Sequence, residues 1–235
     1  MTTTEPITVM QRYELKYILT AKQTQFFCER IEGHMEPDAY GLTSIASLYY
    51  DTPNYRLIRA SLEKPAYKEK IRLRSYGPAT ERSPVFLELK RKADGIVYKR
   101  RIVTTLPEAQ RFLSGAGALG ADSQINREIR YFCDYYRTLV PTCMIICDRT
   151  AYFEPNGDLR LTIDRAPRFR TDDFRFRRLS EGTPLLTPGE TILEIKVQET
   201  IPLWLVRILA DGGIQRGTIS KYGEAYRRQA VNQAI

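Results

Sequence analysis

The sequence of 235 residues contains a single histidine, His34, and only four cysteines. One histidine argues against a histidine-ligated metal site and against a Ser–His–Asp hydrolase triad. Cys28 and Cys133 fall in helix-like segments, while Cys143 and Cys147 share the apolar run TCMIICD. Because no further cysteine or histidine accompanies them, we expect buried reduced thiols rather than a zinc site. This cysteine usage favours a cytoplasmic location.

Long apolar runs and a targeting segment are also missing. No stretch approaches the roughly 18–20 apolar residues that a membrane span requires. The N-terminus, MTTTEPITVMQRYELKY, lacks the basic-then-apolar order of a signal peptide. The apolar fraction of 43% and the charged fraction of 27% are typical of a globular chain. We therefore expect one domain over residues 1–235, with its core at about 8–228, and no membrane span.

Charge of one sign is in excess. Lys and Arg number 36 against 28 Asp and Glu, a formal net charge of +8. Such a balance indicates an anionic partner, which could be nucleic acid, a membrane surface or a phosphate-rich small molecule. The run RFRTDDFRFRR mixes aromatics and arginines as single-strand nucleic-acid surfaces do, but its Asp172–Asp173 pair favours a solvated loop.

Six segments predict helices by their caps, their apolar spacing and their terminal Pro or Gly residues. They are 20–34, 54–62, 107–114, 123–139, 202–210 and 220–231. The stretch 166–190 is irregular and predicts a long ordered excursion rather than a domain linker.

Six further segments alternate charged and apolar residues, as strands with two different faces do. They are 11–19, 70–76, 85–92, 96–103, 159–165 and 192–198, with Arg100 as an exception on an apolar face. An antiparallel sheet with one solvent-exposed face would alternate too, but exposed strand faces usually include Thr, Ser, Tyr and Gln beside charge. The helices also need apolar surface to cover. Both observations predict a barrel with an apolar exterior under helices and a charged interior.

The charges on these strand faces are mostly positive. Nine cations stand against four acids; the cations are Arg12, Lys16, Arg72, Arg74, Lys90, Lys99, Arg101, Arg160 and Lys196, and the acids are Glu14, Glu88, Asp164 and Glu194. Enclosed unpaired cations are costly, so a polyvalent anion such as a chain of phosphates is the expected occupant. Acids among the cations suggest Mg²⁺ or Mn²⁺, which phosphate-transfer sites hold through one or two carboxylates and substrate phosphates.

Eight motifs in order carry a family resemblance. They are RYELKY (12–17), YYDT (49–52), KIRLRSY (70–76), LELKRK (87–92), DRTAY (148–152), LRLTID (159–164), ILEIK (192–196) and SKY (220–222). Together they resemble the VTC domain, the polyphosphate polymerase branch of the CYTH-like triphosphate tunnel metalloenzymes. The resemblance implies an α+β fold: an eight-stranded antiparallel β-barrel tunnel with a charged lumen and helices packed outside.

The resemblance also assigns roles to matching positions. Lys16, Arg72, Arg74, Lys90, Arg149, Arg160, Lys196 and Lys221 are the expected tunnel cations that grip a triphosphate or product chain. Arg12, Lys99 and Arg101 on the strand faces, with Ser220 in SKY, are the expected further substrate contacts. Glu194 and Glu14 are the expected ligands of Mn²⁺ or Mg²⁺, although Glu194 could instead pair only with Lys196.

The implied activity is a polyphosphate polymerase that moves the terminal phosphate of ATP onto a polyphosphate chain. Arg12 replaces the first glutamate of the superfamily's ExExK pattern, which argues against a hydrolase with paired metal-binding glutamates. A triphosphatase and a non-catalytic polyphosphate- or nucleotide-binding module remain as alternatives. No nucleic-acid partner is expected, while a membrane-protein partner and the oligomeric state stay open. Asp51 is expected to cap the following helix, and Asp164 either to orient an arginine or to bind metal.

Overall fold

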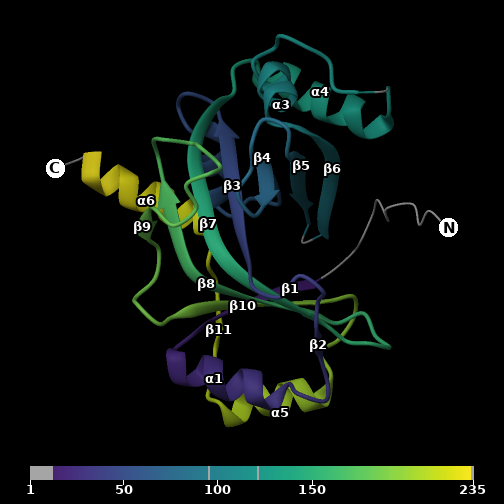
Figure 1. The fold of residues 1–235 in the computed structure, drawn as a ribbon, viewed down its shortest axis with the longest axis vertical. Helices are drawn as coiled ribbons and strands as arrows, with labels where there is room; N and C mark the ends of the chain where they lie inside the picture. The colour runs from purple at the N-terminus through teal and green to yellow at the C-terminus, as the bar shows by residue number, and fades with distance from the viewer. Residues whose placement is uncertain (1–12, 95, 121, 234–235) are drawn as a thin grey trace.

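The computed structural model describes residues 13–94, 96–120 and 122–233 (Figure 1). All six predicted helices are present: α1 Ala21–Arg30, α2 Arg56–Leu62, α3 Leu106–Leu113, α4 Gln124–Tyr136, α5 Leu203–Asp211 and α6 Lys221–Gln233. Thr20 begins α1 through a capping box, in which its hydroxyl accepts from the Gln23 amide at 3.3 Å. None of these helices, within the described ranges, is both long and apolar enough to cross a bilayer.

All described strands belong to one antiparallel sheet, in which long and very short strands occur together. Its long strands are β1 Tyr13–Leu19, β3 Thr43–Asp51, β4 Tyr67–Tyr76, β5 Pro84–Ala93, β6 Ile96–Thr105, β7 Val140–Phe153, β8 Arg160–Arg170 and β10 Thr191–Val197. Three two-residue strands, β2 Glu36–Pro37, β9 Thr183–Pro184 and β11 Arg216–Gly217, pair with β7, β8 and β1. The strand order is β11-β1-β10-β8-β7-β3-β4-β5-β6.

The eight long strands are adjacent in this order, but the predicted closed barrel is wrong for the described residues. No pairing joins β6 to β1 there, so the sheet is open. The outer edge of β1 is instead used by β11, with Lys16 opposite Gly217. Because a strand has only two hydrogen-bonding edges, β11 and β10 occupy both edges of β1.

Two apolar cores cover the convex face of the curved sheet. Helices α3 and α4 pack over β3, β4, β5 and β7, where Leu73, Leu87 and Phe132 are buried. Helices α1 and α5 pack over β1, β8 and β10, around Phe27 and Leu193. Figure 1 shows the two helix pairs at opposite ends of the molecule, with the long strands β7 and β8 running between them.

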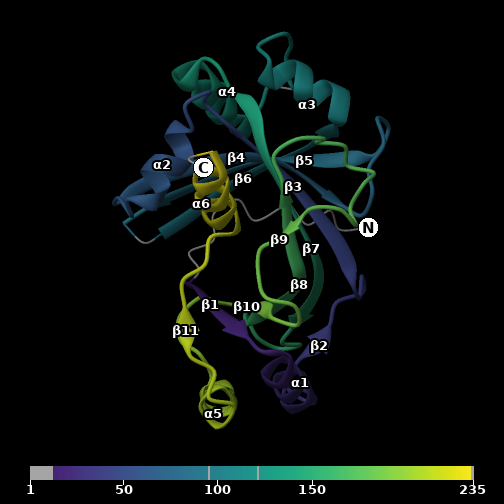
Figure 2. The same cartoon turned by 90° about the vertical axis from the view of Figure 1, so that its left-hand side faces the viewer.

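The prediction that all helices pack outside is wrong for α6. Its Tyr222 and Ala225 pack with Cys143 and Ile145 of β7, which lie on the face opposite to the α3–α4 core. Helix α6 therefore lies on the concave face, beside α2 and across β7 (Figure 2). The cause is the run TCMIICD, which is apolar on both faces of β7 and so can be covered from both sides.

Asp51 anchors the start of α2, as predicted. Its carboxylate accepts from the backbone amides of Leu57 at 2.8 Å and Ile58 at 2.9 Å. The same carboxylate accepts from the Tyr222 hydroxyl at 3.0 Å, so it also ties α6 to the end of β3. This buried carboxylate is structural.

Three other predictions can be compared with the structure. Arg100, the exception in the strand alternation, donates to Glu128 of α4 at 2.9 Å and so fixes that helix to β6. The irregular stretch 166–190 is ordered, since β8 runs on to Arg170 and β9 pairs with it. All four cysteines are free; Cys143 and Cys147 are buried as predicted, whereas Cys28 and Cys133 are only partly buried. Burial raises the pKa of Cys133 and Cys147 to about 12.

Candidate functional site

Two clusters of ion pairs occupy the concave face. The first, called here the Glu194 cluster, contains Glu194 of β10 and Asp164 of β8, with cations from β1, β7, β10 and α6. Oε1 of Glu194 lies 3.2 Å from Lys221 Nζ, and its Oε2 lies 3.1 Å from Lys196 Nζ. Asp164 accepts from Arg149 Nε at 2.5 Å and Nη2 at 2.7 Å, and lies 2.5 Å from Lys221 Nζ. Strand pairing explains the contact between Arg149 and Asp164, because these residues stand opposite each other on β7 and β8.

Glu14 of β1 connects this cluster to β5, which lies near the other end of the strand order. Its Oε1 lies 3.1 Å from Lys16 Nζ, which is also 3.5 Å from Glu194 Oε1. Its Oε2 accepts from Lys90 Nζ of β5 at 3.1 Å. The predicted residues Lys16, Lys90, Glu14 and Glu194 are therefore brought together from β1, β5 and β10.

The second cluster, called the Glu88 cluster, surrounds one carboxylate on β5. Glu88 is 1% exposed and receives four cations from the neighbouring strands. The shortest N–O separations are 2.8 Å for Arg72, 3.8 Å for Arg74, 2.7 Å for Lys99 and 3.1 Å for Arg101. All four were predicted to contact substrate, and here they share one internal anion.

Electrostatics keeps these carboxylates ionised. Burial acts to raise the pKa of Glu194, but Lys221, Lys196, Lys16 and Arg149 hold it well below its usual range. The pKa of Asp164 is lowered in the same way, against burial, by Lys221 and Arg149. Each carboxylate thus acts as a fixed negative charge among an excess of cations.

Three of the predicted site residues are not among the ion pairs of the two clusters. Arg160 lies on β8 opposite Lys196, but its guanidinium turns to the carbonyls of Leu159 and Gly157 and stacks over Phe153. Ser220 lies at the start of α6, where its hydroxyl accepts from Lys70 Nζ at 3.3 Å. Arg12 lies outside the described residues.

Sequence reasoning missed several contributors to the concave face, among them Lys70 and Tyr49. Lys70 lies on the same face of β4 as Arg72, and the period-two spacing within KIRLRSY could have identified it. Tyr49 of β3 stands opposite Arg72 and accepts from its Nη1 at 2.9 Å. Tyr49 belongs to the YYDT motif, but β3 carries no alternation of charge, so no role in the site was assigned to it.

The carboxylates of the Glu194 cluster fit a divalent cation in part. No group of three or more Asp, Glu, His or Cys side chains suited to a metal occurs in the described ranges. Glu14 and Glu194 nevertheless both contact the Lys16 ammonium, so their oxygens can address one cation. Two carboxylates complemented by substrate phosphates are a usual set for Mg²⁺.

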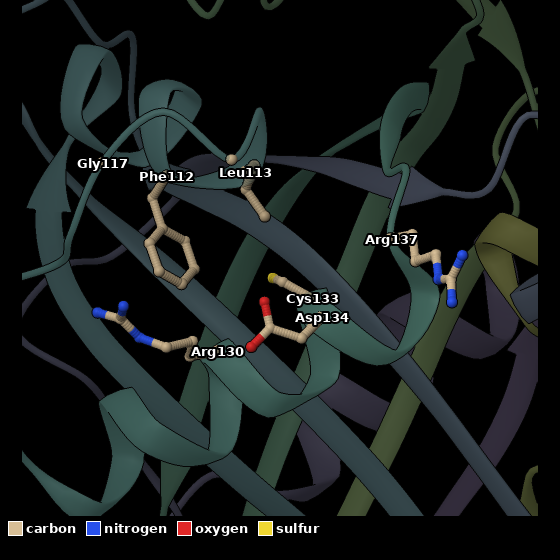
Figure 3. Close-up of a pocket in the computed structure, with 8 residues that line it drawn as sticks. Phe112, Leu113, Gly117, Arg130, Cys133, Asp134 and Arg137 are labelled. Carbon is tan, nitrogen blue, oxygen red and sulfur yellow. The ribbon is translucent and has the colours of Figure 1, made fainter.

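Two surface pockets lie away from the two ion-pair clusters. One cavity of about 380 Å³ is lined by α3 and α4 residues that include Phe112, Arg130, Cys133 and Asp134 (Figure 3). A second, of about 770 Å³, lies between α1 and the segment after β9. Neither contains a residue of the two clusters, so the ion-pair face remains the candidate site.

Comparison with known proteins agrees with this arrangement. The VTC domain matches residues 11–229. The chain belongs to the VTC domain family. A search of curated proteins finds no match.

Solved structures show the same fold at low sequence identity. One is a proposed adenylate cyclase from Bacillus halodurans, with 13% identity, a TM-score of 0.54, and coverage of 91% of this chain and 96% of the other. Another is HpAC1 from Hippeastrum, a proposed adenylyl cyclase described as having a dominant triphosphatase activity. It has 18% identity, a TM-score of 0.50, and coverage of 91% and 93%. The VTC domain here therefore has the curved-sheet fold of these cyclase-like proteins.

Proposed function

We propose that this VTC domain is a polyphosphate polymerase that transfers the terminal phosphoryl group of ATP to a polyphosphate chain. The observation that carries the proposal is the composition of the two clusters: nine cations contact four carboxylates, so five positive charges are left for a bound anion. A chain of phosphates supplies many negative charges within a narrow space, and it can engage cations from several strands at once.

The cations can stabilise the transferring group from several directions. Arg72 and Arg74 project from β4, Arg149 from β7, and Lys196 and Lys221 from β10 and α6. Phosphoryl transfer requires in-line positioning and stabilisation of charge on the equatorial oxygens rather than covalent participation of the protein. Asp164 fixes the Arg149 guanidinium through two hydrogen bonds, so this donor is oriented before substrate arrives.

The acceptor requires no general base, because the oxygen at the end of a phosphate chain is already ionised. This agrees with the place of His34, which stacks on Trp204 at 4.2 Å on the α1–α5 side of the molecule. A divalent ion bound by Glu194 and Glu14 would neutralise charge on the phosphates. The proposed metal is Mn²⁺ or Mg²⁺, because both ions prefer oxygen ligands such as carboxylates and phosphates.

The test is incubation of the purified chain with ATP and Mn²⁺ or Mg²⁺, followed by phosphorus NMR and gel analysis. Long chains with release of ADP are the expected products. Inorganic phosphate without chains would overturn the polymerase in favour of a triphosphatase, the activity described for HpAC1. Binding of ATP without turnover would leave a polyphosphate- or nucleotide-binding module.

The Glu194→Gln variant tests the metal assignment. Loss of its charge should abolish metal-dependent turnover while triphosphate binding persists, because the cations of the cluster remain. Glu199→Gln is the matched control, since Glu199 is exposed after the end of β10. Full activity in the Glu194 variant would refute a metal role for this carboxylate.

A further inference from the structure

Lysines face one another across three strands at the end of the concave face. Lys68 of β4 stands opposite Lys92 of β5, and Lys70 stands opposite Lys90. Lys90 also stands opposite Lys99 of β6. These five residues are called here the lysine ladder. Directly opposed side chains lie about 5 Å apart at Cβ, where like charges destabilise a sheet.

Carboxylates compensate only part of this ladder. Lys90 pairs with Glu14 and Lys99 with Glu88. Within the described residues, no carboxylate lies within 4.0 Å of Lys68, Lys70 or Lys92. The repulsion between these lysines is therefore left for an external anion to relieve.

The nearest acid in sequence does not help. Glu69 lies between Lys68 and Lys70, but strand alternation turns it to the convex face. There it accepts from Arg91 at 3.1 Å and from the Tyr136 hydroxyl at 2.9 Å. The alternation thus separates the acid from the lysines beside it.

Two of the lysines without a carboxylate partner, Lys68 and Lys70, have lowered pKa values. Burial lowers the pKa of Lys68, and the positive charges of Lys92 and Lys64 lower it further. Burial, with Lys68, Lys90 and Lys16 nearby, lowers the pKa of Lys70 to about 8 although Tyr49 opposes the shift. A bound anion would reverse these effects.

The ladder is continuous with both clusters. Lys90 belongs to the ladder and to the Glu14 contact, and Lys99 belongs to the ladder and to the Glu88 cluster. Lys70 lies two residues before Arg72 on β4, whereas Lys92 at the end of β5 is exposed. The five lysines thus lead from the enclosed cations to solvent.

We propose that the lysine ladder is a second anion subsite, which holds the part of a long polyphosphate chain that extends beyond the phosphates bound in the two clusters. This inference rests on the proposed function and adds preference for long chains over triphosphate. A single-stranded nucleic acid fits less well, because such sites stack bases on aromatic side chains. Tyr67 and Tyr98 lie on the opposite faces of their strands. The Tyr222 ring, 5.9 Å from Lys70 Nζ, is buried and stacked on Tyr49, so it presents no face to a base.

The test compares the Lys68→Gln/Lys92→Gln double variant with the wild-type chain in binding to tripolyphosphate and to long-chain polyphosphate. We expect the affinity for the long chain to fall about tenfold, with tripolyphosphate affinity unchanged. The control is Lys22→Gln/Arg207→Gln, which removes two exposed charges from α1 and α5. It should alter neither affinity.

Several outcomes would overturn the inference. They are an unchanged long-chain affinity in the double variant, an equal loss in the control, and an equal loss for tripolyphosphate. A larger loss for a single-stranded oligonucleotide of equal charge than for polyphosphate would also overturn it. The double variant should be at least as stable to urea as the wild type, because it removes an opposed like-charge pair. Failure of wild type to bind either phosphate chain would instead refute the proposed function.

Discussion

Nζ of Lys90 lies 3.1 Å from Oε2 of Glu14, although five strands separate β5 from β1 in the sheet. The sheet must therefore curve strongly enough for its distant strands to meet through their side chains. Backbone pairing contributes nothing to this contact in the described part of the chain, since β1 pairs with β10 and β11. The ion pair, rather than a hydrogen-bonded ladder, spans the charged face.

This contact predicts a small effect on stability and a larger one on anion binding. The side chains of Lys90 and Glu14 are 40% and 20% exposed, so Lys90→Met should lower the free energy of unfolding by less than about 1 kcal/mol. Tripolyphosphate affinity should fall about fivefold, because one enclosed cation is lost. Urea unfolding and calorimetric binding measure the two effects. Lys22→Met, on the exposed side of α1, is the control and should change neither.

Removing the charge of Glu88 should cost more stability than Lys90→Met and should strengthen anion binding instead of weakening it. Glu88→Gln leaves four enclosed cations without their shared carboxylate, so unfolding should become easier by about 3 kcal/mol. Because those cations then lack an internal anion, tripolyphosphate should bind about tenfold more tightly and raise the Tm more than in wild type. Thermal unfolding with and without tripolyphosphate is the measurement.

The control for that experiment is Glu128→Gln on α4. Glu128 also joins two arginines, Arg91 and Arg100, but on the convex face. It should lose some stability without a gain in the Tm shift produced by tripolyphosphate. Identical shifts in the Glu88 variant and wild type would contradict the role given to Glu88.

Replacing Asp51 should lower the stability of the protein, and added phosphate chains should not restore it. Asp51→Ala removes the acceptor of two α2 amides and of the Tyr222 hydroxyl, so it should cost about 3 kcal/mol. Asp122→Ala, at a 78% exposed side chain, should cost less than about 0.5 kcal/mol. Denaturant titration distinguishes them. A fully stable Asp51 variant would show that the cap contributes little to the attachment of α2 and α6.

The acidity of Lys70 predicts a pH dependence of anion binding. Its pKa is lowered to about 8, first by burial and then by Lys68, Lys90 and Lys16, while Tyr49 acts in the other direction. Above pH 8 the free protein loses this positive charge, whereas a bound anion raises the pKa and draws a proton back. The affinity for long-chain polyphosphate should therefore fall more steeply between pH 7 and about 9.5 in wild type than in Lys70→Arg. Parallel pH profiles would contradict this assignment.

Much of the site was predictable because alternation in a strand is a local property. The spacing of Arg72 with Arg74, and of Glu194 with Lys196, placed these residues on the charged face, and the structure brings them there. What the spacing could not reveal is which cations share a carboxylate. The four partners of Glu88 come from two neighbouring strands, and the contact of Glu14 with Lys90 depends on the curvature of the whole sheet.

The errors in the fold prediction have equally specific causes. Strand β11 is two residues long, so no periodicity announces that it occupies the edge of β1. Helix α6 lies on the concave face because Cys143 and Ile145 present an apolar surface there, while Met144 and Ile146 present another behind. An apolar run on both faces predicts burial without saying which helix covers which side.

The two apolar cores give the molecule two separately stabilised halves. One contains β4 and β5 with α3 and α4, the other β1 and β10 with α1 and α5, and β7 and β8 connect them (Figure 1). The charged side chains face each other between these halves. A phosphate chain that binds cations of both halves would link them, so its binding should slow amide hydrogen exchange in the two halves together. Mechanical coupling between the halves would then be a property of the ligand as much as of the protein.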